Sequence, residues 1–153
     1  MKRGILIGIT VVVIGLAAGV IFYRTYSRQG GDATFGGVSL KLEYATTTPV
    51  QERGLGGRSS IPDHYGMLFV FGTASRYGFW MKDMLVPIDI FWLDGSLRVV
   101  SVSRDVSPST YPDVFYPPVP VRFVLETAAG FARANNIATG TPLIWKDVID
   151  VSK

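Results

Sequence analysis

Residues 88–103 read IDIFWLDGSLRVVSVS, and the prediction of the fold starts from this stretch. A mostly apolar run precedes Asp94-Gly95, and an alternation of apolar and polar residues follows it. An Asp-Gly pair between two such runs is a strong signal for a β-hairpin. The stretch therefore predicts two antiparallel strands, over residues 88–93 and 97–103.

Strand patterns continue on both sides of this hairpin. The run GMLFVF, residues 66–71, is nearly all apolar, as expected for a central strand that is buried on both faces. Further strands are expected over 38–44, 78–82, 122–126 and 143–145, and short helices over 49–55 and 128–135. These elements predict a β-rich α+β fold, a small curled sheet or closed β-barrel of about six or seven strands with two short helices.

The N-terminal segment has a different character. Residues 4–22 read GILIGITVVVIGLAAGVIF, without a charge. A helix of this length spans roughly 28 Å, close to the hydrocarbon thickness of a bilayer. The run is also longer than that of a cleaved signal peptide, which is the alternative interpretation. We expect a membrane anchor over 1–23, a flexible tether over 24–37 and a globular domain over 38–150.

Basic residues flank the apolar run on both sides. They are Lys2, Arg3, Arg24 and Arg28. Their weak bias places the N-terminus inside and the domain outside, in the periplasm or the extracellular space. Without these four, 11 of the 15 basic residues remain against 12 acidic ones, so the domain carries a net charge near −1. Nucleic-acid-binding domains carry a basic excess, so nucleic acid is not an expected partner.

Several enzyme classes lack their characteristic residues. The chain has no cysteine and one histidine, His64, in an expected surface turn. Thiol catalysis is therefore excluded, and a zinc site would have too few ligands. No phosphate-binding loop and no Gly-x-Ser-x-Gly elbow occurs. We expect neither a metal nor a cofactor, and an enzyme is the less favoured interpretation.

Ionisable side chains interrupt the apolar strands. The period of two places Arg122 and Glu126 on one face of their strand, and it predicts a partly buried Asp89. A buried carboxylate needs a partner, and Arg53 and Arg58 are candidates because a guanidinium binds a carboxylate with two hydrogen bonds. An ion-pair network that fastens a helix to the sheet would explain these residues without any function.

The functional alternative is a polar-aromatic pocket for a small anionic or carbohydrate-like molecule. The residues expected to line it are Arg53, Arg58, Trp80, Lys82, Asp89, Arg122 and Glu126. A catalytic pair of carboxylates, Asp89 with Glu126, is a further possibility. Three hypotheses remain open: an extracytoplasmic binding or accessory module for a small molecule or an envelope protein, an envelope hydrolase, and a structural partner of another membrane protein.

A proline-rich segment separates the hairpin from the next strand. Residues 107–121 read SPSTYPDVFYPPVPV. Proline fixes φ and removes N–H donors, so a stiff extended loop is expected. This loop covers a face or edge of the sheet, or it forms one wall of a ligand groove.

An ordered set of short motifs resembles a known family. The motifs are Arg53-Gly54-Leu55 with Arg58, GMLFVF at 66–71, FWMK at 79–82, PID at 87–89, and VLE at 124–126 with Ala129-Gly130. The set is similar to the bacterial and archaeal family called domain of unknown function 192, over about residues 38–148. The resemblance implies a compact β-rich fold, often behind a signal or anchor segment, and no established reaction.

The chain departs from the family pattern at two places. Gly56 stands where the family tends to have Met, and Asp83-Met84 stands where it tends to have Asn-Thr. If the Asn-Thr pair carries an activity in the family, the resemblance implies that this chain lacks it.

Overall fold

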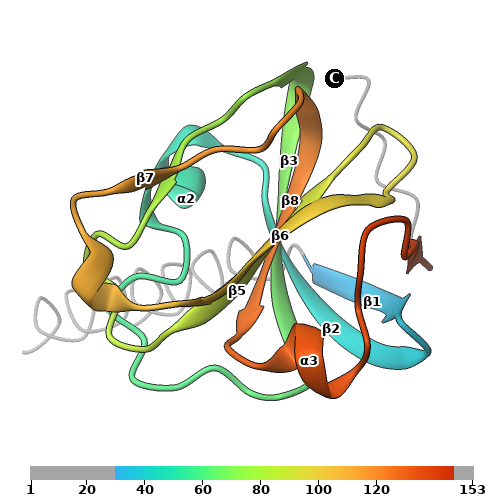
Figure 1. Cartoon of the computed structure of the whole chain (residues 1–153), viewed down its shortest axis with the longest axis horizontal. Coiled ribbons are helices and arrows are strands. Elements are labelled where there is room, and N and C mark those ends of the chain that lie inside the picture. The colour runs from blue at the N-terminus through green and yellow to red at the C-terminus, as the bar shows by residue number, and fades with distance from the viewer. Residues whose placement is uncertain (1–29, 147–153) are drawn as a thin grey trace, which may run out of the picture.

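The computed structural model describes residues 30–146 (Figure 1). Its strands are β1 (Gly30–Phe35), β2 (Val38–Ala45), β3 (Tyr65–Ser75), β4 (Phe79–Trp80), β5 (Ile88–Leu93), β6 (Val99–Val106), β7 (Val114–Phe115), β8 (Val121–Ala128) and β9 (Leu143–Trp145). Its helices are α2 (Thr48–Arg53), α3 (Phe131–Ala134) and the 3-10 helix η1 (Pro108–Thr110). Within this range no helix has the length and apolar character needed to cross a bilayer. The predicted anchor, residues 4–22, lies outside the described residues.

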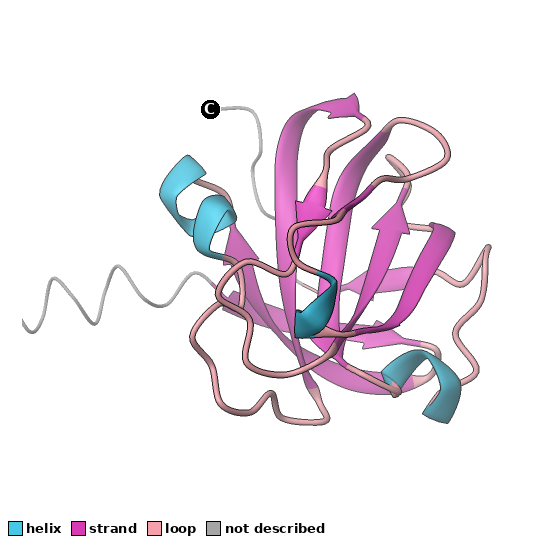
Figure 2. Ribbon diagram, turned by 60° about the vertical axis from the view of Figure 1, so that its left-hand side comes forward, coloured by secondary structure: helices cyan, strands magenta, loops and turns pink. Residues whose placement is uncertain are grey.

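One curled sheet forms the frame of the molecule. Seven strands are ordered β6-β5-β8-β3-β2-β1-β9, and β4 pairs with β7 in a separate small sheet. All neighbours in the large sheet are antiparallel except β2 and β3, which are parallel and connected through α2. The sheet curls into a half-barrel (Figure 2). Its edge strands β6 and β9 meet only at their ends, through the Arg98–Pro142 bridge and the hydrogen bonds of Val99 to Thr141 and of Leu143 to Leu97, so the structure is the predicted curled sheet and not a fully paired barrel.

The predicted hairpin is confirmed. Strands β5 and β6 pair antiparallel, with Phe91 opposite Val102. The turn is held by Asp94, whose Oδ1 accepts the N–H groups of Ser96 at 2.8 Å and Arg98 at 3.0 Å. This side chain explains why the Asp-Gly signal in the sequence predicted the turn correctly.

Strand β1 lies within the residues expected to form the tether. Its glycines suggested a flexible linker, but Ala33 and Phe35 are fully buried and alternate with more exposed neighbours. The strand pairs with both β2 and β9, so its backbone groups are satisfied on both sides. Residues 30–35 of the expected tether are therefore part of the sheet.

The expected strand over residues 78–82 is shorter and lies apart from the main sheet. Only Phe79 and Trp80 are extended, and they pair with Phe115 and Val114 of the proline-rich segment. We call this two-stranded unit, β4 with β7, the flap. The segment carries a strand that the sequence did not predict because two residues are too few to show a period.

The two faces of the sheet carry two separate hydrophobic cores. The first core includes Leu68, Phe91 and Leu125, together with Phe131 of α3. The second core contains residues one position along the same strands, such as Phe69 and Val124, and packs under α2 and the flap. Burial of each large apolar side chain contributes about 1.5–3 kcal/mol to the free energy of folding. Both faces are thus covered, as the apolar run at residues 66–71 predicted.

Helix α3 is shorter than expected. It covers Phe131–Ala134 instead of residues 128–135, because β8 continues to Ala128 and Gly130 is left-handed. Asn136 closes it with φ 52°, as the sequence predicted. Helix α2 agrees more closely, with proline in its first turn and Gly54 at its end.

Candidate functional site

The strand register divides the predicted site residues between the two faces. Residues directly opposite each other in neighbouring strands share a face. Glu126 is opposite Met67 and Ile90, and these three lie on the face of the second core. Asp89 is opposite Thr127, one position further along, and therefore lies on the other face. The two carboxyl groups are separated by the sheet.

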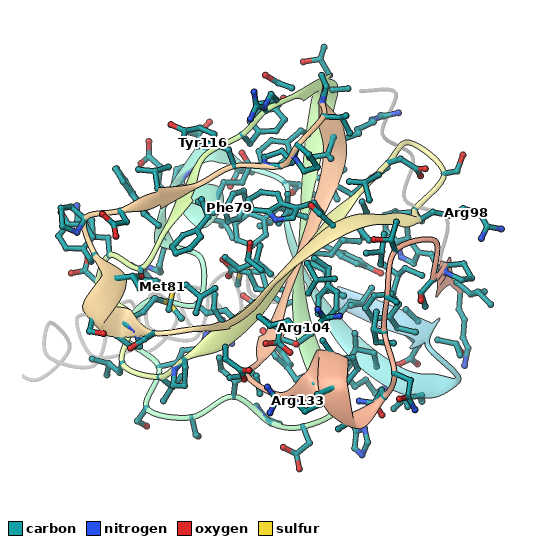
Figure 3. The ribbon with its side chains drawn as sticks, in the orientation of Figure 1. Phe79, Met81, Arg98, Arg104, Tyr116 and Arg133 are labelled. Carbon is teal, nitrogen blue, oxygen red and sulfur yellow. The ribbon has the colours of Figure 1, made fainter. Side chains whose placement is uncertain are left out.

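A cavity of about 230 Å³ lies on the Glu126 side. It is formed by α2, the chain that follows α2, strands β3 and β8, and β4 of the flap. The residues that line it are Thr48, Gln51, Glu52, Arg53, Gly54, Leu55, Phe69, Phe71, Tyr77, Gly78, Phe79, Trp80, Lys82, Met84 and Glu126. Figure 3 shows Phe79 and Met81 on the side of the molecule that carries the flap, away from Arg98 and Arg133. Ligand sites of drug size typically have about 300–1,000 Å³, so this cavity suits a small molecule.

Glu126 is the buried ionisable group of this cavity. The Glu126 residue is 5% exposed, and Oε2 of its carboxyl group has no hydrogen-bond partner. Burial raises the pKa of the Glu126 carboxyl to about 8, while the backbone N–H of Leu55 and the charge of Arg58 act to lower it. At neutral pH the carboxyl is therefore mostly protonated, and it can donate a hydrogen bond as well as accept one.

The end of α2 brings backbone close to this carboxyl. Gly54 ends the helix with φ 53°, a conformation that glycine adopts without steric cost. A Cβ at this position would lie 3.5 Å from Glu126 Oε2 and 3.4 Å from Phe69 Cζ. A Cβ would thus fit beside the carboxyl, and glycine is favoured here by its backbone conformation, which precedes the residue whose N–H reaches Glu126, Leu55.

Aromatic rings form the apolar wall of the cavity. Phe79 makes edge contacts with Phe69 and Phe71, at centroid distances of 4.8 Å and 6.5 Å. Phe71 stacks on Tyr77 at 3.6 Å. Trp80 is 51% exposed and stands at the mouth of the cavity, in ring contact with Tyr111 of the proline-rich segment. The flap therefore supplies aromatic surface both inside the cavity and outside it.

The proline-rich segment covers the second core and does not line the cavity. Phe115 and Val121 pack into that core, and no residue of 107–121 lines the cavity. Between the two predictions for this loop, the structure favours a cover over a face of the sheet. The segment influences the cavity indirectly, because β7 holds β4 in place.

Four of the seven predicted site residues meet at the cavity. They are Arg53 at the end of α2, Trp80 and Lys82 on and after β4, and Glu126 on β8. Arg53 and Lys82 are exposed at the rim, and neither has a hydrogen bond or an ion pair from its side chain in the described part of the chain. The other three predicted residues, Arg58, Asp89 and Arg122, do not line the cavity.

Arg58 belongs to a polar cluster beside the cavity. It donates to Glu43 Oε2 and to the Tyr65 hydroxyl, each at 2.8 Å, and Tyr65 donates to the same Glu43 oxygen. Burial alone would lower the pKa of Arg58, but these contacts together raise it. Arg58 acts on Glu126 only through its charge, so the predicted direct pairing of Arg53 or Arg58 with a buried carboxylate is wrong.

Asp89 has a structural role on the other face. Its Oδ1 accepts the N–H of Asp105 and its Oδ2 accepts the N–H of Ala132, both at 2.8 Å. The residue is fully buried, and both of its oxygens have partners. Asp89 thus fastens α3 and β6 to β5 and is not available to a ligand.

These positions rule out the predicted catalytic pair. Asp89 and Glu126 lie on opposite faces, so they cannot act on one bond as a pair of carboxylates must. Arg122 is also outside the cavity, because its Nε donates to the carbonyl of Phe71 at 3.1 Å. Among residues 30–146, no three His, Asp or Glu side chains are grouped so that they could hold a metal ion.

Several cavity residues were missed by the sequence analysis. The most informative are Gln51, whose side-chain N–H groups donate to the carbonyls of Ala45 and Val70 at 3.0 Å, and the aromatic residues of β3 and β4. Phe69 and Phe71 are two positions apart on β3, so the period of two could have placed them beside Glu126. Gln51 gives no such signal, because both of its partners lie on strands that the sequence does not place next to α2.

The departures from the family pattern lie at this site. Asp83 has φ 58°, a left-handed conformation that Asn and Asp adopt more readily than other non-glycine residues. Met84 is buried and lines the cavity. Met84 thus adds an apolar side chain to the wall of the cavity.

Comparison with known proteins agrees with the resemblance. Residues 32–145 match the family model DUF192, described as "Uncharacterized ACR". A solved structure from Sinorhizobium meliloti, described as a "putative transcription regulator", is 24% identical with a TM-score of 0.73, covering 78% of this chain and 95% of that chain. A protein of unknown function from Novosphingobium aromaticivorans is 26% identical with a TM-score of 0.71, covering 76% and 85%. No curated protein matches the chain. Since the family model covers most of the sequence, the chain belongs to the DUF192 family.

Proposed function

We propose that this domain is a ligand-binding module that takes a small molecule into the cavity at Glu126. The carrying observation is the Glu126 carboxyl, which is buried in the cavity wall with one oxygen that has no partner. An unsatisfied buried polar atom costs about 1–3 kcal/mol. A protein of marginal stability keeps such a group where function requires it, and a ligand would supply the missing hydrogen bond.

The surroundings of Glu126 support binding. The cavity combines aromatic walls with a few polar groups, which is the usual composition of a small-molecule site. Arg53 and Lys82 stand at its rim without ion pairs among residues 30–146. A structural network would have paired these charges, as it does for Arg58 and Glu43.

The proposal includes the location of the module. Residues 4–22 would hold it at a membrane as a single N-terminal helix, with the N-terminus inside and the domain outside. Strand β1 starts at Gly30, so residues 23–29 would connect the proposed anchor to the sheet. Seven extended residues reach at most about 25 Å, and the module would thus work close to the membrane surface.

A thermal-shift screen tests the proposed function. The full-length protein and its Glu126→Gln variant are heated in detergent with a panel of sugars, amino acids and organic acids. A ligand present at about 100 times its Kd adds about 2.7 kcal/mol of stability. We expect at least one class of compound to raise Tm of the wild type, with an altered shift in Glu126→Gln. If no compound binds and the signals of cavity residues such as Phe71 do not move in NMR spectra, the proposal fails.

A hydrolase that uses Glu126 is the second candidate. A carboxyl with a pKa of about 8 keeps its proton at neutral pH and suits general acid catalysis. Glu52 is the other carboxyl group that lines the cavity, and it would have to serve as the base. Turnover of chromogenic glycosides or esters that disappears in both Glu126→Gln and Glu52→Gln would favour this candidate over a binding module.

A further inference from the structure

The cavity has an uneven distribution of charge, and this limits the chemistry of its ligand. Two cationic side chains, Arg53 and Lys82, line it together with one anionic side chain, Glu52. All three are exposed at the rim. Glu126, at the buried end, adds no negative charge while it is protonated. At neutral pH the rim therefore carries an excess of one positive charge.

The two cations form no ion pair in the described structure, although Glu52 lines the same cavity. The ion pairs of residues 30–146 join Lys41 with Asp32, Arg58 with Glu43, and Arg133 with Asp105, and none involves the cavity cations. An anionic group at the mouth would gain charge-assisted hydrogen bonds from both cations, at little cost because they remain hydrated at the rim. A cationic ligand would meet the same two charges as repulsion.

The middle of the cavity is apolar. Leu55, Phe69, Phe79 and Met84 are buried around it, and Phe71 and Tyr77 stack on its wall. These side chains offer no hydrogen bonds to a sugar ring, apart from the Tyr77 hydroxyl, which donates to the Thr73 carbonyl at 2.8 Å. An acyl chain or an aromatic ring fits this wall better than a polyhydroxylated ring does. A volume of about 230 Å³ lies below the usual range of drug-sized sites, so the cavity suits a molecule with one ring.

The buried end presents a hydrogen-bond donor. The backbone N–H of Leu55 hydrogen bonds to the carboxyl of Glu126, while Oε2 has no partner. A protonated carboxyl has one O–H to donate, and Glu126 lines the cavity. A carbonyl or hydroxyl oxygen of a ligand would accept this bond.

From this arrangement we infer that the cavity takes a small organic anion with an apolar body. Its acid group lies between Arg53 and Lys82, its body contacts the aromatic wall, and an acceptor oxygen at its far end meets the Glu126 carboxyl. The inference rests on the proposed binding function and deepens it by naming the class of ligand.

Three matched probes test the class of ligand. 4-Acetylbenzoate has the acid, the ring and the acceptor; 4-isopropylbenzoate replaces the acceptor with a methyl group of similar shape; 4-acetylbenzylamine replaces the acid with a cation. Binding is measured by ligand-observed NMR on the full-length protein in nanodiscs. Empty nanodiscs of the same lipid correct for partition of the probes into lipid, and the Arg53→Gln/Lys82→Gln variant in nanodiscs tests the contribution of the two cations.

At about pH 6.5 we expect 4-acetylbenzoate to bind best, since a lost hydrogen bond to a buried donor costs roughly tenfold in affinity. The double variant should bind it at least about fivefold more weakly, the effect of one lost charge-assisted contact. Tighter binding of the cationic probe, equal binding of the isopropyl probe, or no binding of 4-acetylbenzoate at millimolar concentration would each overturn the inference.

The pH dependence gives a second readout that a merely structural Glu126 would not produce. Above pH 8 the ionised carboxylate repels the ligand and cannot donate, so wild-type affinity should fall by up to tenfold per pH unit. Glu126→Gln keeps an N–H donor but cannot ionise, so its affinity should stay constant between about pH 6.5 and about pH 9.5. Wild-type affinity that rises with pH would contradict an anionic ligand. If the cationic probe then binds in a manner that requires Glu126, the binding function stands and only the ligand class is wrong.

Discussion

Asp89 and Glu126 are buried carboxyl groups on neighbouring strands, and their surroundings are opposite in kind. Asp89 has two N–H partners at 2.8 Å and lies in the closed first core. Glu126 has an oxygen without a partner and lies at a cavity under α2 and the flap. Burial of an ionisable side chain therefore does not by itself identify a functional site. A carboxyl with both oxygens satisfied has a structural role, whereas one with an unpartnered oxygen at a cavity is a candidate for the proposed binding role.

Replacement of Asp89 should have the largest effect on the free energy of unfolding. Asp89→Asn replaces one acceptor oxygen with an NH₂ group, which would face the backbone N–H of Ala132 or Asp105. We expect a loss of about 3–5 kcal/mol in the free energy of unfolding, because a buried network loses a charge and a partner. Urea unfolding followed by the fluorescence of buried Trp92 measures it.

Asp94→Asn is the matched control for this change. Asp94 also accepts two backbone N–H groups, but it does so in an exposed turn. We expect this variant to lose only about 1 kcal/mol, because water can satisfy the N–H groups. Equal losses in the two variants would show that Asp89 is not a buried anchor.

Glu126 should make stability depend on pH in the direction opposite to that of an ordinary ion-paired carboxylate. Its folded pKa of about 8 exceeds the ordinary value of 4.5, so the folded state holds a proton that the unfolded chain releases. The stabilisation is present below about pH 4.5 and is lost as the pH rises towards 8. Each unit of difference is worth ~1.4 kcal/mol, so the loss amounts to a few kcal/mol.

The Glu126→Gln variant isolates this effect. It should be more stable than the wild type at pH 9, and the difference between the two proteins should shrink as the pH is lowered. Parallel curves of unfolding free energy against pH, with no convergence, would contradict a raised pKa.

Arg58→Gln tests the link between the polar cluster and the cavity. The variant loses a half-exposed ion pair with Glu43 and a hydrogen bond with Tyr65, so we expect about 1 kcal/mol of destabilisation. It should also raise the pKa of Glu126 further, since the charge of Arg58 acts to lower it. An NMR titration of the Glu126 carboxyl in this variant checks the direction, and an unchanged pKa would mean that the two groups are not coupled.

Trp80→Ala should have the smallest effect on stability. Trp80 is 51% exposed at the cavity mouth, so we expect the free energy of unfolding to change by less than about 1 kcal/mol. Trp92, which is buried in the second core, is the control, and its replacement by alanine should cost about 3–5 kcal/mol. A large loss in Trp80→Ala would indicate that the Trp80 ring itself, and not only Phe79 and Phe115 of the flap, packs into the second core.

Much of the fold followed from local patterns in the sequence. The period of two placed Val124 and Glu126 on one face of their strand and Leu125 on the other face. The Asp-Gly pair predicted the β5–β6 turn. Strand β1 was missed because its burial comes from pairing with β2 and β9, and the latter is more than 100 residues away in the sequence. A short glycine-rich segment carries no local sign of such a distant partner.

The candidate site was only partly predictable for the same reason. Alternation gave the faces of Asp89 and Glu126 but not their partners, which are backbone N–H groups of β6, α3 and the chain after α2. Arg58 was expected to meet a buried carboxylate, yet it meets the half-exposed Glu43 of β2. The choice among acceptors depends on the parallel pairing of β2 and β3, which hydrophobic patterns do not show.

The most direct test is the protonation of Glu126 in the free protein. Carbon-13 spectra of the full-length chain with labelled glutamate side chains, assigned with Glu126→Gln, give the pKa of this carboxyl. We predict that the Glu126 signal titrates near pH 8. A Glu126 signal that titrates near 4.5 would mean that the carboxyl is hydrated or ion-paired, and the cavity would lose the group on which its function depends.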